Sequence, residues 1–223
     1  MAQLFLVPTP IGNLEDITLR ALRILREADV ILAEDTRTSA VLLKHFEIAG
    51  TILPFHAHNE HQKLEATLEI IENNKSVALI TDAGTPGISD PGFLLVRACI
   101  ARKIPVSCLP GATAFVPALV VSGFPCNEFS FYGFLPQKKG RQSKWQEISS
   151  ESKTMIFYES PFRLLKLLEE IKIIFGPHRE ISVSREISKL HEEIVRGTSE
   201  ELLNFFKKKP SIKGELVIVI KGN

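Results

Sequence analysis

Short apolar runs recur along the first half of the chain, and each is followed by a loop rich in Gly, Pro, Thr or Asp. Runs without polar alternation are typical of parallel strands that are covered on both faces. They predict strands over residues 3–7, 30–33, 51–54, 77–81 and 106–109. Helical spacing of apolar residues predicts helices over 19–25, with Asp16 as its cap, and over 39–46, 64–71 and 93–101. We therefore expect an α/β domain with a parallel sheet over residues 1–116.

The longest of these loops spans residues 81–92 and reads TDAGTPGISDPG. Connections between a strand and a helix usually have about two to six residues, so this one is long. Ligands of open α/β sheets bind beyond the carboxyl ends of the strands, where glycines allow close approach to the backbone. The loop therefore predicts a ligand site, and the alternative is a plain connection. Asp90 is expected to cap the next helix, with Pro91 in its first position.

Longer strands with more alternation dominate the second half, over 128–134, 154–158, 180–185 and 215–220. Helical patterns lie over 115–121, 164–175 and 200–207. These patterns predict a second α/β domain with a mixed sheet over residues 117–223. Because pockets favour domain interfaces, we expect the ligand cleft between the two halves.

Charge is nearly balanced, with 27 Lys and Arg against 26 Asp and Glu. The chain thus lacks the overall basic signature of many nucleic-acid-binding proteins, and any such contact must come from local patches. The three cysteines have no Cys-x-x-Cys spacing, which favours reduced thiols in a cytoplasmic protein. The first apolar run is too short for a signal peptide or a membrane span, so we expect a soluble protein that binds no membrane.

Seven sequence blocks, in order along nearly the whole chain, resemble those of the tetrapyrrole methylase superfamily. They are LVPTPIGNLEDIT at 6–18, AEDTRTS at 33–39, TDAGTPGISDPG at 81–92, LPGATA at 109–114, GFLP at 133–136, YESPFR at 158–163 and SREISKLHEE at 184–193. Within the superfamily, they are similar to the small-subunit ribosomal RNA methyltransferase I family. Many members of that family continue into a small helical carboxyl-terminal domain, whereas this chain stops at Asn223.

The resemblance implies a two-domain homodimer that transfers a methyl group from S-adenosylmethionine to the ribose 2′-hydroxyl of a cytidine. The implied substrate is 16S ribosomal RNA in the assembled 30S subunit. The resemblance also implies cofactor contacts in the loops and in the second domain: Pro10, Asp82, Ala83, Gly84, Thr85, Ile88, Thr113, Ala114 and Phe157. For Asp82 and Thr85, the alternative role is turn capping. The chain has no GxGxxG motif, which disfavours a dinucleotide site.

A ribose hydroxyl is a poor nucleophile, so a positioned group should take its proton. Acids and bases in the loops expected to face the cleft are the candidates. Four of them rank highest as catalytic residues: Asp35, Arg37, Arg185 and Lys189. For each one, the alternative is a solvated surface charge or an ion pair.

Two segments are candidates for RNA contacts. The segment 56–61 reads HAHNEH, and His-x-His spacing can chelate a metal. Methyl transfer needs none, so we expect no metal site and assign His58, Asn59 and Glu60 to RNA contact. Lys138, Lys139 and Arg141 form the densest basic patch, which suits phosphate contacts, and the alternative is a solvated loop.

Two other functions stay open on this reasoning. A methyltransferase of the same fold can act on a tetrapyrrole or another small molecule, but the basic patch and the 184–193 block disfavour it. A non-enzymatic ribosome-binding module that retains the cofactor is the other alternative.

Overall fold

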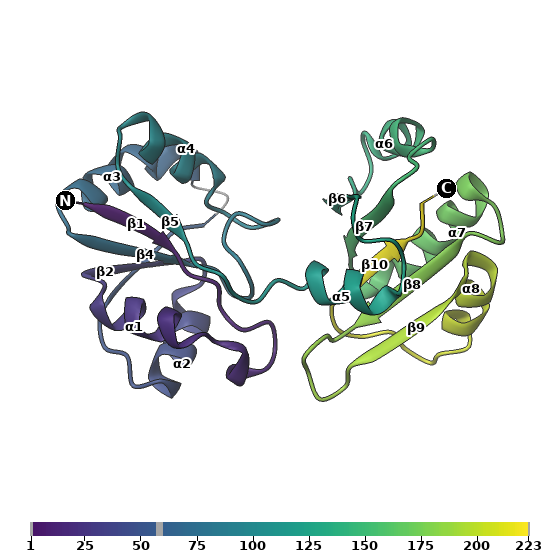
Figure 1. The fold of residues 1–223 in the computed structure, drawn as a ribbon, viewed down its shortest axis with the longest axis horizontal. Helices are drawn as coiled ribbons and strands as arrows, with labels where there is room; N and C mark the ends of the chain where they lie inside the picture. The colour runs from purple at the N-terminus through teal and green to yellow at the C-terminus, as the bar shows by residue number, and fades with distance from the viewer. Residues whose placement is uncertain (1, 57–59, 223) are drawn as a thin grey trace. The chain divides into compact units, whose positions relative to one another are not determined.

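A computed structural model describes residues 2–56 and 60–222 of the chain. The chain divides into two compact units, a first unit over Met1–Thr113 and a second unit over Ala114–Asn223 (Figure 1). The boundary expected after residue 116 would fall inside the first helix of the second unit, α5 (Phe115–Ser122).

The first unit is built on a sheet whose strands are all parallel. The strands are β1 (Gln3–Leu6), β2 (Val30–Ala33), β3 (Thr51–Pro54), β4 (Ser76–Ile80) and β5 (Val106–Cys108). Their order in space is β3-β2-β4-β1-β5. Leu6 lies opposite Leu79 and Cys108, and Ala33 lies opposite Ile80, so the strands end together along one edge. We call this edge the carboxyl edge. The prediction of a parallel sheet is confirmed.

Helices cover both faces of this sheet (Figure 1). They are α1 (Leu19–Glu27), α2 (Thr36–His45), α3 (Glu60–Glu72) and α4 (Phe93–Ala101), with a short 3-10 turn η1 (Leu14–Asp16) before the first. Leu25 of α1 and Leu43 of α2 pack on one face. Leu68 of α3 and Leu95 of α4 pack on the other. The first unit is therefore doubly wound, as the alternation of strands and helices predicted.

Both predicted helix caps in this unit are wrong. Asp16 belongs to η1, and Thr18 caps α1 by accepting a hydrogen bond from the backbone N–H of Ala21 at 3.0 Å. Asp90 lies in the loop because the Pro91 carbonyl accepts from the Gly87 N–H at 3.1 Å, and α4 begins only at Phe93.

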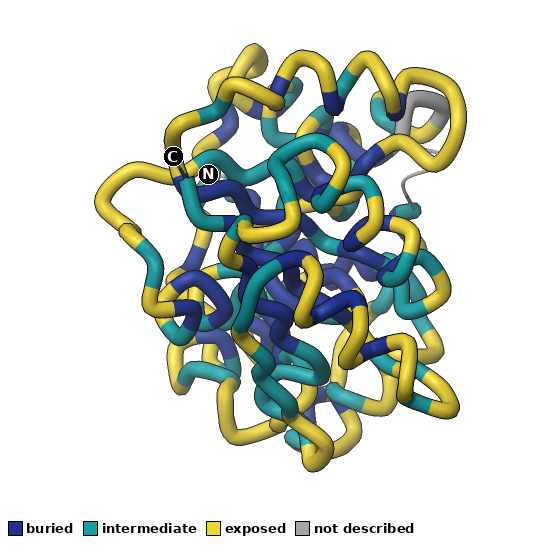
Figure 2. Tube along the Cα trace, turned by 90° about the vertical axis from the view of Figure 1, so that its right-hand side faces the viewer, coloured by how far each residue is buried: buried dark blue, intermediate teal, exposed yellow. Residues whose placement is uncertain are grey.

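The second unit contains a mixed sheet, as predicted. Its strands are β6 (Phe129–Phe134), β7 (Thr154–Glu159), β8 (Glu180–Arg185), β9 (Glu193–Thr198) and β10 (Leu216–Ile220), in the order β6-β7-β10-β8-β9. β6 and β7 are parallel, whereas β10 runs antiparallel to both β7 and β8. The central strands β7, β10 and β8 are almost wholly buried. In Figure 2, buried segments gather inside the trace and exposed ones lie around them.

The two faces of this sheet are covered unequally. α5 lies on one face, where Leu119 packs with Ile156 and Val217. The other face carries three helices, α6 (Arg141–Ile148), α7 (Leu164–Phe175), which follows a 3-10 turn η3 (Pro161–Arg163), and α8 (Ser199–Lys207). Trp145 and Leu168 belong to the core on that side. The sequence patterns predicted neither α6 nor β9.

Across residues 2–56 and 60–222, no helix has the length and apolar character needed to cross a bilayer.

Candidate functional site

The carboxyl end of β4 is the point where the connections of the sheet diverge. β4 lies between β1 and β2, whose following helices α1 and α2 cover one face. The chain leaves β4 toward α4, which covers the opposite face. Neighbouring strands with helices on opposite faces leave a crevice beyond their carboxyl ends, where ligands of such folds bind. The loop over residues 81–92 begins at this carboxyl edge, directly after β4.

Thr9 joins the loop after β1 to the loop after β4. Its backbone N–H donates to the Gly84 carbonyl at 2.9 Å, and the Gly84 N–H donates to the Thr9 carbonyl at 3.0 Å. The Thr9 hydroxyl, which is 1% exposed as a residue, donates to the Thr81 carbonyl at 3.0 Å. Gly84 has φ of +87°, a backbone conformation that favours glycine. These bonds fix the two predicted cofactor loops side by side, and the sequence reasoning had not assigned Thr9 any role.

The loop after β5 packs against the loop after β1 at Gly111. A Cβ atom added there would lie 2.5 Å from the Cβ of Pro8, which is closer than side-chain carbons approach. Gly111 is therefore required for the contact of these two loops.

Thr85 ties the loop after β5 to the long loop. Its hydroxyl donates to the Ala112 carbonyl at 2.9 Å and lies 2.6 Å from the Thr113 hydroxyl oxygen. A hydroxyl has one proton, so Thr113 is the donor in the second bond. The Ile88 N–H donates to the Thr85 carbonyl at 3.2 Å. Three predicted cofactor contacts, Thr85, Ile88 and Thr113, are thus brought together by internal bonds.

Three carboxylates meet where β2 and β4 end. The Asp35 N–H donates to an Asp82 carboxylate oxygen at 3.2 Å, and the Asp82 N–H lies 3.4 Å from a Glu34 carboxylate oxygen. Burial is the main cause that raises the pKa of both Glu34 and Asp82. The hydrogen bonds from the Arg37 side chain and backbone instead lower the pKa of Asp35. The pKa of Asp35 is therefore shifted in the opposite direction from the pKa values of its neighbours Glu34 and Asp82.

Asp35 and Arg37 form a closed pair at the start of α2. The Asp35 carboxylate caps the helix by accepting from the Arg37 N–H at 2.8 Å. The same carboxylate binds the guanidinium through Nη2 at 2.7 Å and Nε at 3.1 Å. Arg37 keeps 89% of its side chain exposed, so its guanidinium can still bind an anion from solution.

The remaining two predicted catalytic residues lie in the second unit, in separate ion-pair groups. Arg185 pairs with Glu193 at 3.0 Å, and Glu193 also pairs with Lys209. Lys189 contacts Glu186 at 2.9 Å and Glu215 at 2.8 Å. Burial lowers the pKa of Lys189, but the hydrogen bonds and charges of the two carboxylates outweigh it and raise the pKa. Lys189 is therefore held as a cation.

The side chain of Phe157 does not line a site, which corrects its assignment as a cofactor contact. It is 0% exposed and belongs to the core under α6 and α7. Its ring stacks on Tyr132 with centroids 5.2 Å apart. Ala114, another predicted contact, precedes α5 as its N-cap residue.

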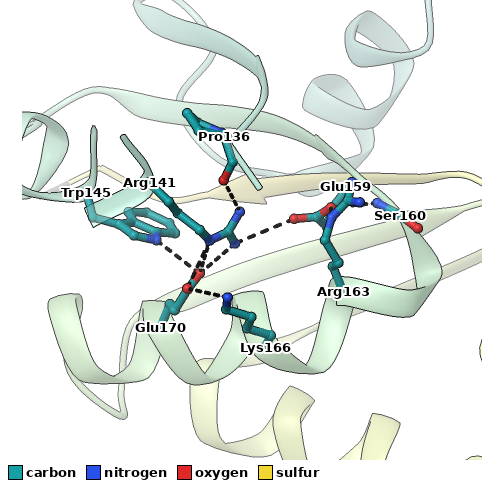
Figure 3. A network of polar contacts seen from close by, with 8 residues as sticks. All are labelled: Pro136, Arg141, Trp145, Glu159, Ser160, Arg163, Lys166 and Glu170. Carbon is teal, nitrogen blue, oxygen red and sulfur yellow. Dashed lines mark hydrogen bonds and ion pairs between the residues drawn. The ribbon is translucent and has the colours of Figure 1, made fainter. Parts of the chain in front are cut away.

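Arg141 is not an exposed RNA contact, which corrects a second assignment. Its side chain is 5% exposed and binds Glu170, with Nη2 at 2.6 Å, while Nη1 donates to the Pro136 carbonyl at 3.1 Å (Figure 3). Nη2 also lies 3.6 Å from Glu159. Lys138 and Lys139, by contrast, are exposed.

The Arg141 cluster continues to the residues that follow β7 (Figure 3). Glu159, with 2% of its side chain exposed, accepts from the Ser160 N–H at 2.8 Å and from Arg163 Nε at 2.7 Å. Trp145 Nε1 donates to Glu170 at 3.0 Å. The cluster therefore joins the GFLP, basic and YESPFR segments of the sequence within one unit.

Two predicted RNA contacts, His58 and Asn59, lie outside the described residues, as does the side chain of Glu60. In the described part of the chain, no group of three or more His, Cys, Asp or Glu side chains is arranged to hold a metal ion.

Comparison with known proteins defines the class to which this fold and edge belong. The family model described as Tetrapyrrole (Corrin/Porphyrin) Methylases matches residues 3–203. The chain belongs to the tetrapyrrole methylase family.

Within that family, two relatives that carry the same name are similar to this chain over nearly its whole length. The Ribosomal RNA small subunit methyltransferase I of Halalkalibacterium halodurans is 46% identical over 99% of this chain and 76% of its own length. The protein of the same name from Thermotoga maritima is 45% identical over 100% of this chain and 99% of its own length. Among solved structures, the uroporphyrin-III C-methyltransferase of Thermus thermophilus complexed with S-adenyl homocysteine has a TM-score of 0.67 at 20% identity, covering 97% of this chain and 96% of that one. This likeness shows the fold.

Proposed function

We propose that this protein is an S-adenosylmethionine-dependent methyltransferase that modifies the ribose 2′-hydroxyl of a cytidine in 16S ribosomal RNA. The observation that carries the proposal is the 45% identity to a ribosomal RNA small subunit methyltransferase I over 100% of this chain. The carboxyl edge of the first unit, with its closely joined loops, supports it physically.

The residues at this edge fit S-adenosylmethionine. Gly84 is buried with a positive φ, and its N–H and carbonyl both bind Thr9, so it fixes the shape of the long loop, while the small side chain of the half-buried Ala83 leaves room for a ligand beside it. Asp82 is exposed as a residue, and its carboxylate suits the ammonium group of the methionine part. Pro10, Thr85, Ile88, Thr113 and Ala114 complete the proposed contacts. When bound, the sulfonium supplies an electrophilic methyl group.

The proposed catalytic residues divide their work by charge. Arg37 and Lys189 hold positive charge for the RNA phosphates, and Arg185 positions Glu193 in the same segment. Asp35 stays ionised because Arg37 lowers its pKa, so it orients the ribose hydroxyl through a hydrogen bond and is a weak base. Glu34, whose pKa burial raises, is the better-matched acceptor for the hydroxyl proton. Glu34 is not among the four residues that rank highest in the sequence analysis.

RNA binding is proposed for the exposed Lys138 and Lys139, with His58, Asn59 and Glu60 as further contacts. The assembled 30S subunit is the proposed substrate, and the cytoplasm is the proposed location. A homodimer is supported by exposed apolar side chains on one face of the second unit. Val116 and Val120 of α5 are 48% and 65% exposed, and Phe129 of the edge strand β6 is 40% exposed.

Incubation with methyl-labelled S-adenosylmethionine tests the proposal. Purified 30S subunits and a porphyrinogen are offered in separate reactions, and label is expected in 16S RNA alone. Label in the porphyrinogen would favour tetrapyrrole methylation, and label in neither would favour a non-enzymatic role. Mapping of 2′-O-methyl sites in rRNA from cells lacking the gene would then give the position.

A further inference from the structure

A groove of about 580 Å³ lies between α6 and α7 in the second unit. Its lining combines lysines, amides and aliphatic side chains: Lys138, Lys166, Gln142, Gln146, Ile173 and Ile174. Arg141, Trp145 and Glu170 form its floor, where the Trp145 indole and the Glu170 carboxylate join the two helices at 3.0 Å. Hydrogen bonds among these three side chains therefore fix the spacing of α6 and α7 along the groove.

The two ends of the groove differ in chemistry. β6 and β7 are parallel, so α6 and α7, which follow them, both begin at the same end. Lys138 precedes α6 and Lys166 lies in the first turn of α7, which places both lysines at that end. Ile173 and Ile174 lie two turns further along α7. Ile173 is 82% exposed. One end is thus cationic and the other apolar.

The cationic end keeps its charge. Glu170 is the one acidic residue of the lining, and Arg141 already binds it through Nε at 2.9 Å and Nη2 at 2.6 Å. Lys166 reaches Glu170 only at 4.0 Å and keeps 59% of its side chain exposed. Among the described residues, Lys138 has no ion-pair partner. Two lysines are therefore available to an anion.

A nucleotide matches this arrangement better than an acidic peptide does. A phosphate would meet Lys138 and Lys166, and the face of a base would cover the exposed Ile173. Gln142 and Gln146 lie one turn apart on α6 and offer amides that donate and accept along the edge of a base. An acidic peptide would use the lysines but would leave this apolar and amide-lined end without a matching partner.

We propose that the groove between α6 and α7 binds a single-stranded segment of the RNA substrate, with phosphate at Lys138 and Lys166 and a base against Ile173. This inference rests on the proposed function. It extends the RNA contact from the exposed lysine loop onto two helices.

The test compares Lys166→Gln and Ile173→Ser with Lys172→Gln, which removes the same charge from the same helix outside the groove. Lys172 pairs with Glu200 of α8 at 2.6 Å. Affinity for a single-stranded RNA oligonucleotide is measured by fluorescence anisotropy at several salt concentrations. The two groove variants should bind at least about fivefold more weakly, and Lys166→Gln should reduce the salt slope by about 0.7. Lys172→Gln should bind as the wild type does.

Steady-state methylation of 30S subunits provides the second readout. The groove variants should raise KM and leave kcat at saturating subunits unchanged, because the methyl-transfer residues are intact. The inference is overturned if both groove variants bind RNA as tightly as the wild type does. This holds also if a polyglutamate probe binds the groove instead. Failure of the wild type to label any rRNA would overturn the proposed function. Groove-dependent binding of the oligonucleotide would, even then, support RNA binding at the groove.

Discussion

Arg141 and Glu170 face each other between α6 and α7, with the guanidinium Nη2 2.6 Å from the carboxylate. The two residues are 29 positions apart in the chain, and the arginine side chain is 5% exposed. The same guanidinium donates to the Pro136 carbonyl, so it fixes the start of the segment that carries Lys138 and Lys139. The buried guanidinium of Arg141 thereby positions the segment with the exposed lysines.

Replacement of Arg141 by Met should lower the free energy of unfolding by about 3 kcal/mol, because the partly buried Glu170 would lose its main ion-pair partner and the Pro136 carbonyl its donor. Urea denaturation measures the change. Lys139→Met, at an exposed position, is the control and should change stability by less than about 0.5 kcal/mol. Equal stability of the two variants would show that the cluster has no structural role.

Gly111→Ala should destabilise the first unit by about 2 kcal/mol and weaken cofactor binding, because the new methyl group would overlap Pro8. Thermal unfolding and calorimetric titration with S-adenosylhomocysteine measure the two effects. Gly50→Ala is the matched control, since its added Cβ would make an ordinary contact at 3.8 Å with Ile31. If Gly111→Ala binds as tightly as Gly50→Ala, the contact between the two loops is not needed for the site.

Asp35→Asn should separate the proposed catalytic role of this residue from its role as a helix cap. Asn caps a helix about as well as Asp does, so the melting temperature should stay unchanged. It carries no charge for Arg37, so methyl transfer to 30S subunits should fall at least about tenfold. Asp35→Ala, which also removes the cap, should lower both activity and melting temperature. Full activity of Asp35→Asn would remove the Asp35–Arg37 pair from the mechanism.

Glu34→Gln should change how stability depends on pH. Burial raises the pKa of the folded Glu34 carboxyl above its ordinary value of 4.5. The folded state then binds more protons than the unfolded state, so this group lowers the free energy of unfolding as pH rises from about 4.5 through the folded pKa. The variant should lose less stability than the wild type across that window. Urea midpoints at several pH values measure the difference, and parallel curves for the two proteins would contradict the assignment.

Much of the first unit could be predicted from the sequence because its strands are continuous apolar runs that end at glycine-rich loops. The second unit shows where such reasoning stops. In β7, nearly every residue of TMIFYE is buried. Apolar and polar residues therefore do not alternate, and the sequence could not show that Phe157 faces α6 and α7 rather than α5. The site residue Arg141 was misassigned for a related reason. A basic segment resembles a solvated loop until its partner, Glu170, is brought near by tertiary structure. No role was predicted for Thr9 or Gly111, because their contacts join loops that are distant in the sequence.

The position of β10 has a consequence for how the chain matures during synthesis. β10 lies between β7 and β8, although it is made after both. The first unit can complete its sheet once β5 has emerged, whereas the second must wait with two strand edges unpaired until residues 216–220 arrive. Nascent chains that stop short of β10 should therefore have a folded first unit and a second unit whose unpaired strand edges favour aggregation. Folding of the second unit thus depends on synthesis of β10.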